Sequence, residues 1–179
     1  MFPTLMINVA ALGSLIVGSA SRGVASTRRH APCDSVRLCG ADRPPVNEVL
    51  NRLSPVNIAY LGDSVWECEA RERLLWPPSK VDTLSSSVQR LCCAEGQYDI
   101  LQRIEEGFGL TEAEQDWLRR GRNASGRGPR RLAPKVYRAS TAFETLIGVL
   151  YLSDTNRLAA LFEFIFATQP EDVSSEVEG

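Results

Sequence analysis

Two carboxylates stand inside stretches of the chain that are otherwise mostly apolar. Asp63 lies in AYLGDSVWE, residues 59–67, and Glu144 lies in YRASTAFETLIG, residues 137–148. Because an ionised carboxylate is costly to remove from water, each is expected to be compensated by a cation or by hydrogen-bond donors. Mg²⁺ prefers a few carboxylates and keeps several waters, and Mn²⁺ could replace it. Asp63 and Glu144 are therefore the candidate metal ligands and catalytic residues.

A stretch that contains no acidic residue and much positive charge lies between these carboxylates. The net charge of the whole chain is −2, but the electrostatic footprint of a binding site is local. A metal site beside a cationic loop suited to phosphates indicates a metal-dependent nuclease. The residues predicted to contact nucleic acid are Arg119, Arg120, Arg122, Asn123, Arg127, Arg130, Arg131, Lys135 and Arg138.

Each of these features also has a plainer interpretation when it is taken alone. Asp63 could be an ordinary hydrogen-bonded or ion-paired acid, and Glu144 a solvated residue opposite a buried face. The basic stretch could be only a solvated loop. Other catalytic classes are disfavoured, because His30 is the single histidine and the five cysteines match neither a zinc site nor a disulfide framework.

The first part of the chain has the composition of a targeting segment. Residues 5–20 are apolar and end in small residues, like a signal peptide, and residues 21–35 are rich in Arg, Ser and Thr, like a transit peptide. Residues 1–45 are therefore predicted to be a disordered leader that directs the protein to a plastid, with a mitochondrion as the alternative. The predicted domain spans residues 46–168, and a disordered acidic tail follows at residues 169–179.

The predicted domain shows helical periodicity and no alternating strand pattern, which predicts an all-α fold. Ser54 is expected to cap a helix, Thr111 and Glu114 form a capping box, Pro134 opens a helix, and Asp82 caps another. A loop is expected at residues 121–133, between the helix that begins at Thr111 and the helix that begins at Pro134. Helices are predicted over residues 46–53, 54–75, 82–106 with a break near Gly96, 111–120, 134–153 and 156–167.

A helical projection places the two carboxylates differently. Asp63 lies between apolar and polar sides of a central helix, so it is expected to point into a seam. Glu144 lies opposite a broad apolar face, among small polar residues that leave room for a metal ion. Gly62 and Gly148 lower helix stability, so a close approach of another backbone or of substrate is expected at each.

Three segments together resemble the ribonuclease III family and, more narrowly, its compact Mini-III branch: NIAYLGDSVWE at 57–67, LRRGRNA at 118–124 and YRASTAFETLIGVLYL at 137–152. The resemblance covers about residues 50–165. It implies a homodimeric helical endonuclease domain that cuts double-stranded RNA with Mg²⁺ and leaves 5′-phosphates. Asp63 falls on the signature aspartate of the family, and Glu144 on its metal-binding glutamate.

Some acids of the longer family members are replaced here, by Val56, Ala59 and Thr141. The Mini-III branch shares these departures, so they leave the number of metal ions open without implying inactivity. The resemblance further implies maturation of large-subunit (23S) ribosomal RNA precursors, with a ribosomal protein as a helper and no membrane partner. Two alternatives remain at this point: a non-catalytic RNA-binding or ribosome-associated protein of the same fold, and a helical domain that binds a partner but no RNA.

Overall fold

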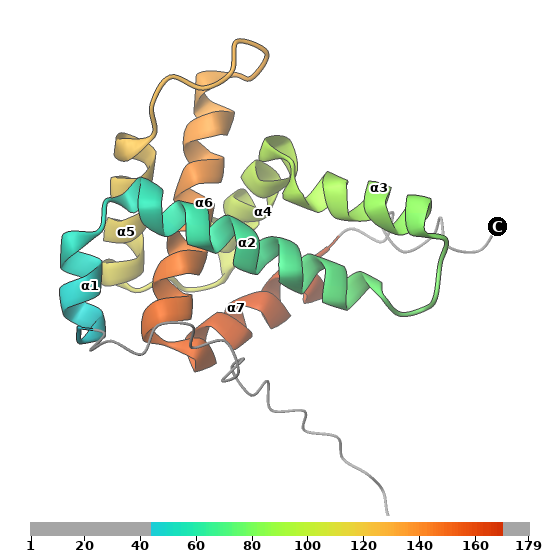
Figure 1. The fold of residues 1–179 in the computed structure, drawn as a ribbon, viewed down its shortest axis with the longest axis horizontal. Helices are drawn as coiled ribbons and strands as arrows, with labels where there is room; N and C mark the ends of the chain where they lie inside the picture. Colours follow the sequence, from blue (N-terminus) through green and yellow to red (C-terminus); the bar gives the residue numbers. More distant parts are fainter. Residues whose placement is uncertain (1–43, 170–179) are drawn as a thin grey trace, which may run out of the picture. The chain divides into compact units, whose positions relative to one another are not determined.

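All regular secondary structure in the described part of the chain is helical (Figure 1), as predicted. The computed structural model describes residues 44–169. Its helices are α1 (Val46–Arg52), α2 (Pro55–Leu74), α3 (Val81–Cys92), α4 (Ala94–Gly107), α5 (Glu112–Ala124), α6 (Pro134–Ser153) and α7 (Thr155–Ala167).

Most of the predicted helix starts are confirmed by their caps. The Ser54 hydroxyl accepts a hydrogen bond from the Asn57 amide at 3.2 Å, which satisfies a free donor in the first turn of α2. Thr111 and Glu114 form the reciprocal capping box of α5, with bonds of 2.8 and 3.2 Å. Pro134 is the first residue of α6.

Two predicted starts differ from the structure. Lys80 occupies the N-cap of α3, so Asp82 lies inside the first turn, where its negative charge still suits the positive end of the helix. At α7 the cap is Asp154, whose carboxylate accepts a hydrogen bond from the Arg157 amide at 2.9 Å. Both differences shift a helix boundary without changing the fold.

The break within the predicted 82–106 helix falls at Cys93 rather than at Gly96. Gly96 is instead part of the first turn of α4, where an added Cβ would lie only 2.0 Å from the Arg90 carbonyl oxygen. Glycine is needed here because the end of α3 and the start of α4 meet in a tight corner.

Helix α5 continues to Ala124, beyond the predicted end near Arg120. Gly121, Arg122 and Asn123 are therefore helical and do not belong to the loop. A Cβ at Gly121 would lie 2.8 Å from the Ala142 Cα, so this glycine permits α5 to pack against α6.

Helix α6 is the central element, in contact with α1, α2, α4, α5 and α7. Its predicted division into an apolar and a polar face is wrong, because Ser140, Thr141 and Gly148 are buried as well. Trp66 from α2 packs edge-on against Phe143, with ring centroids 5.2 Å apart. Burial of these aromatic rings contributes to the hydrophobic stabilisation of the core.

Helices α2 and α6 cross in direct backbone contact. A Cβ at Gly62 would lie 1.8 Å from the Glu144 carbonyl oxygen, and a Cβ at Gly148 would lie 2.3 Å from the Ile58 carbonyl oxygen. Real side chains cannot occupy either position, so only glycine allows the two backbones to touch. The predicted close approach at both glycines is confirmed.

The predicted leader and acidic tail lie almost entirely outside residues 44–169, so their boundaries and disorder stay predictions. Within the helices that the structure describes, none combines the length and apolar character that crossing a membrane requires.

Candidate active site

The α2–α6 crossing brings the two candidate metal ligands to one place. Asp63 follows Gly62 directly on α2, and Gly62 rests on the main chain of Glu144 in α6. The carboxylates are near enough for the charge of Asp63 to raise the pKa of Glu144. Their relative position is therefore fixed by main-chain contact between two helices.

Glu144 carries a charge that its surroundings disfavour. Its side chain is half-buried, and loss of hydration raises its pKa to about 7, with the negative charge of Asp63 adding to the rise. The amide of Gln97 acts in the opposite direction and lowers the pKa. At neutral pH, Glu144 is thus only partly ionised, and a cation would favour its ionised form.

Asp63 is more exposed than the helical projection predicts. Its side chain reaches solvent and does not lie in a buried seam. Partial loss of hydration still raises its pKa, the charge of Glu67 raises it further, and Gln97 lowers it. Glu67 is paired with Arg71 on the same helix at 2.5 Å. The projection failed because it gives the direction of a side chain and not the distance to the neighbouring helix.

Gln97 is a third member of this site, and the sequence analysis did not identify it. It lies in the first turn of α4 and is only 1% exposed. An interaction with the Gln97 side-chain amide lowers the pKa of both Asp63 and Glu144, so this amide lies beside the two carboxyls. The available signal was its position in line with Leu101 and Ile104, because a glutamine on the apolar side of a helix is expected to be buried with a polar partner.

The donor set suits a hard divalent cation. Asp63 and Glu144 offer carboxylate oxygens, and burial is the main cause of the raised pKa of each, so a nearby cation would favour their ionised forms. Residues 44–169 contain no group of three or more His, Cys, Asp or Glu side chains arranged to hold a metal ion. A metal here would keep several waters, as Mg²⁺ does when few carboxylates bind it.

The predicted nucleic-acid contacts are distributed over three elements. Arg119, Arg120, Arg122 and Asn123 lie on α5; Arg127, Arg130 and Arg131 lie in the loop after it; Lys135 and Arg138 lie in the first turns of α6. Three of those on α5 have partners. Arg122 pairs with Glu105 at 2.5 Å, Arg119 pairs with Asp116, and the Arg120 guanidinium lies 3.8 Å from the Trp117 ring centroid.

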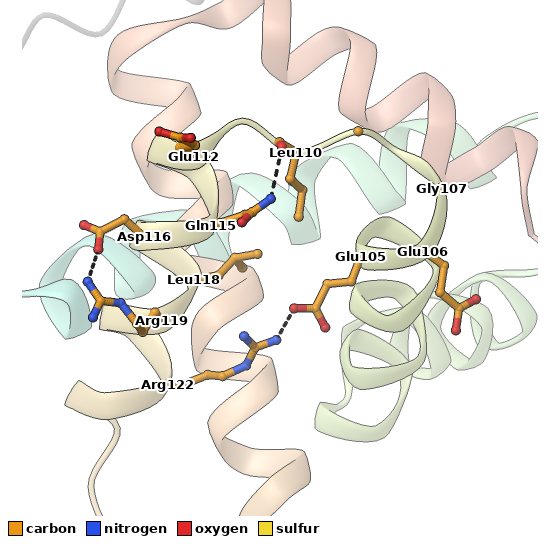
Figure 2. A pocket seen from close by; sticks show the side chains of 11 residues that line it. Glu105, Glu106, Gly107, Leu110, Glu112, Gln115, Asp116, Leu118, Arg119 and Arg122 are labelled. Carbon is orange, nitrogen blue, oxygen red and sulfur yellow. Dashed lines mark hydrogen bonds and ion pairs between the residues drawn. The ribbon is translucent and has the colours of Figure 1, made fainter.

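One cavity of the described residues lies between α4 and α5 and measures about 910 Å³ (Figure 2). Acidic side chains from both helices surround it, and Arg119 and Arg122 reach carboxylates on its walls. Asp63, Gln97 and Glu144 are not among the residues that line it. Its mixed charge and its separation from the carboxylate pair exclude it as the candidate active site.

A second cavity, of about 520 Å³, has a lining whose charged residues are mostly basic. It is formed by α4, α5 and α6, with Arg122, Lys135 and Arg138 facing it and Glu105 opposing them. The Lys135 ammonium lies 5.3 Å from the ring centroid of Tyr98. This cavity shares α4 and α6 with the carboxylate site, and its charge suits a phosphate group.

Several bacterial proteins are similar to this chain. The Mini-ribonuclease 3 of Gloeobacter violaceus is 44% identical over 112 residues, which are 63% of this chain and 82% of that protein. The Mini-ribonuclease 3 of Synechocystis is 42% identical over 125 residues, 70% of this chain and 83% of that protein. A crystal structure of a Fusobacterium nucleatum protein matches with a TM-score of 0.60 and 26% identity, covering 66% of this chain and 95% of that one.

These relatives correct the predicted location. The leader composition favours a plastid protein, with a mitochondrion as the alternative, but the similar proteins come from cyanobacteria and from other bacteria such as Staphylococcus aureus. The likeness is thus to bacterial proteins, and the prediction of a plastid location is wrong. An apolar run followed by arginines and serines is a compositional pattern, and composition alone does not identify a destination.

The sequence model of the ribonuclease III domain matches residues 57–155, more than half of the chain. The matched range contains Asp63, Gln97 and Glu144, and the curated relatives carry the name Mini-ribonuclease 3. This chain therefore belongs to the ribonuclease III family, in its Mini-III branch, and is an endoribonuclease.

Proposed function

We propose that this endoribonuclease cuts double-stranded RNA with Mg²⁺ at the site formed by Asp63 and Glu144. The observation that carries the proposal is the α2–α6 crossing, which brings the two carboxylates together. Enzymes of this family generally use a divalent metal ion. The choice of Mg²⁺, with Mn²⁺ able to replace it, follows from hard oxygen donors and few protein ligands.

The residues of the chain would bind the ion and orient the scissile phosphate. When bound, the divalent ion supplies positive charge that stabilises the negative charge developing on the phosphate and activates water as the nucleophile. Asp63 and Glu144 hold it from two packed helices, which keeps the site rigid during the reaction. No nucleophile from the protein is needed, so the absence of histidine from residues 44–169 is compatible with the chemistry.

The basic residues on α5, the following loop and the start of α6 would contact the RNA backbone. The basic cavity offers Arg122, Lys135 and Arg138 to a phosphate group. A-form RNA is recognised mainly through its shape, its phosphates and its 2′-hydroxyls, so such contacts need no base-specific geometry. A homodimer would present two carboxylate sites to the two strands.

The proposed biological substrate is the large-subunit (23S) ribosomal RNA precursor, with a ribosomal protein as a helper. Its support is the likeness to the Mini-III branch. The RNA ends that accumulate when the protein is depleted would identify the substrate directly. Normal ribosomal RNA ends after depletion would contradict this assignment.

Substitution of the two carboxylates tests the catalytic assignment. Asp63→Asn and Glu144→Gln remove the charges that hold the ion, and a loss of several kcal/mol of transition-state stabilisation slows cleavage by about 100-fold or more. Cleavage of a long RNA duplex in Mg²⁺ is the measurement, and a gel shift in Ca²⁺ checks that binding is retained.

Matched controls are Asp82→Asn and Glu106→Gln, because both acids are exposed and lie on α3 and α4 away from the carboxylate pair. These controls are expected to cleave at the wild-type rate. Equal cleavage by wild type, Asp63→Asn and Glu144→Gln would place the chemistry elsewhere. Cleavage that persists in excess EDTA would contradict the metal dependence.

A further inference from the structure

We propose that Gln97 is a positioning residue of this site, whose side-chain amide lies beside Asp63 and Glu144 and holds the two carboxylates in the arrangement that binds the divalent ion. The inference rests on the proposed function, because it assumes that these two carboxylates bind the metal. It adds a third helix, α4, to a site otherwise built from α2 and α6.

The position of Gln97 is fixed by the main chain around it. The backbone N–H of Gln97 donates a hydrogen bond to the Cys93 carbonyl oxygen at 2.9 Å, in the first turn of α4. The neighbouring Gly96 lies against the Arg90 carbonyl, and the Trp66 indole donates to the Leu91 carbonyl at 3.2 Å. The corner between α3 and α4 is thereby tied to α2, the helix that carries Asp63.

The side chain of Gln97 is buried without a complete set of hydrogen bonds. It is 1% exposed, and its Nε2 has no partner at normal hydrogen-bond geometry. Buried amides are nearly always satisfied, so an exception of this kind calls for an explanation. The amide nevertheless lies close enough to lower the pKa of both Asp63 and Glu144. The buried amide therefore has a free N–H donor available to the carboxylate pair.

The other groups near the site do not perform this task. Glu67 adds negative charge and is paired with Arg71. Burial, followed by the charges of Glu67 and Asp63, raises the pKa of the Cys92 thiol to about 12, so that thiol stays neutral. Neither group can donate to both carboxylates from a fixed helix.

An uncharged donor suits a metal site better than a cationic side chain would. A lysine or arginine at this position would neutralise the carboxylates and compete with the divalent ion. The glutamine amide carries two N–H donors and no net charge, so it orients the carboxylates and leaves their negative charge available. Outer partners of metal ligands act in this way, and their loss typically weakens metal binding about 10- to 100-fold.

The test measures Mn²⁺ binding to the full chain without RNA, from the loss of the free-ion signal in electron paramagnetic resonance at pH 7. Gln97→Met keeps the length of the side chain and removes its donors, so the Kd for Mn²⁺ is expected to rise about tenfold or more. The matched control is Gln89→Met, at an exposed glutamine of α3, which should bind as wild type does. A folded Gln97→Met protein whose Kd stays within about twofold of wild type would overturn the inference.

A second variant keeps the test decisive if Gln97→Met does not fold. Gln97→Glu places a third carboxylate beside the pair, so it should lower the Tm of the metal-free protein at pH 8 and enlarge the rise in Tm on adding Mn²⁺. An unchanged Tm with an unchanged Mn²⁺ response would show that position 97 does not face the carboxylates. Asp63→Asn and Glu144→Gln serve as references. If both variants still bind Mn²⁺ as wild type does, the proposed function itself fails. If both lose Mn²⁺ binding while the Gln97 variants keep it, only the role of Gln97 is contradicted.

Discussion

At the scale of single residues, the site is built from groups whose interactions are incomplete. Glu144 has a pKa of about 7, Asp63 has a raised pKa, and the Gln97 amide has an unpartnered nitrogen. Functional sites often retain such unfavourable features because ligands complete them. The metal-free protein should therefore be less stable than it would be if these groups had complete interactions.

The raised pKa of Glu144 makes the stability of the metal-free protein depend on pH. In the unfolded chain Glu144 loses its proton near its usual value of 4.5, while in the folded chain it keeps the proton up to about pH 7. Because the folded state binds more protons across this window, the free energy of unfolding falls as the pH rises from 4.5 to about 7. Above that range the ionised carboxylate costs roughly 3 kcal/mol at most.

Glu144→Gln removes the charge and should therefore stabilise the metal-free protein at pH 8 by up to roughly 3 kcal/mol, with little effect at pH 4. Urea unfolding in EDTA at the two pH values measures the difference, with Glu106→Gln as the control. A Glu144→Gln protein that is less stable than wild type at pH 8 would contradict the raised pKa.

The sequence predicted this site in part. Asp63 and Glu144 stand out because a carboxylate among apolar residues is unusual, and the structure brings them together. Gln97 has less contrast, because Glu95 and Asp99 on either side of it are also polar. The only sign of its burial in the sequence is its position in line with the apolar residues Leu101 and Ile104. The exposure of Asp63 was missed for a related reason, since it depends on the distance from its side chain to the neighbouring helix.

At the scale of elements, two glycines set the separation of the helices that carry the carboxylates. Gly62 and Gly148 were predicted to permit a close approach because glycine is costly inside a helix. The identity of the approaching element could not be predicted, because it depends on how α2 and α6 cross. Helix starts with strong caps were predicted more reliably than the α3–α4 break, which is fixed by a tertiary contact at Gly96.

Gly62→Ala should separate α2 from α6, because its Cβ would overlap the Glu144 carbonyl oxygen at 1.8 Å. Overpacking of this kind typically costs about 1–3 kcal/mol and moves backbone, so we expect a lower Tm together with loss of cleavage. Thermal unfolding and cleavage of an RNA duplex measure the two effects. Gly126→Ala is the control for stability, because a Cβ there meets nothing within 4 Å. Wild-type Tm and activity in Gly62→Ala would contradict a direct backbone contact.

At the scale of the whole described domain, charge is arranged differently from its order in the sequence. The basic stretch contains no acid, yet Arg122 pairs with Glu105 from α4 and Arg119 pairs with Asp116 one turn earlier. The first pairing joins residues of different helices, so no local pattern predicts it. Arg127, Arg130 and Arg131 are exposed in the loop.

RNA binding should weaken as salt rises, because each neutralised phosphate releases condensed counterions. Replacing the loop residues Arg127, Arg130 and Arg131 with glutamine should lower the affinity and reduce the salt slope by about one for each phosphate that is no longer neutralised. Arg119→Gln, at a residue already paired with a carboxylate, should reduce the slope less. Gel shifts in Ca²⁺ between about 50 and 200 mM salt give these slopes. A flat response of the wild-type protein would contradict the assigned RNA contacts.

The pairing of Arg119 and Arg122 with internal carboxylates also bears on selectivity. A free nucleotide that displaced one of these carboxylates would exchange one anion for another and gain little binding free energy. A long duplex can make many exchanges after a single association step, so the small gains accumulate into avidity. Such pairing would favour long duplexes over free nucleotides, whatever their nucleotide sequence.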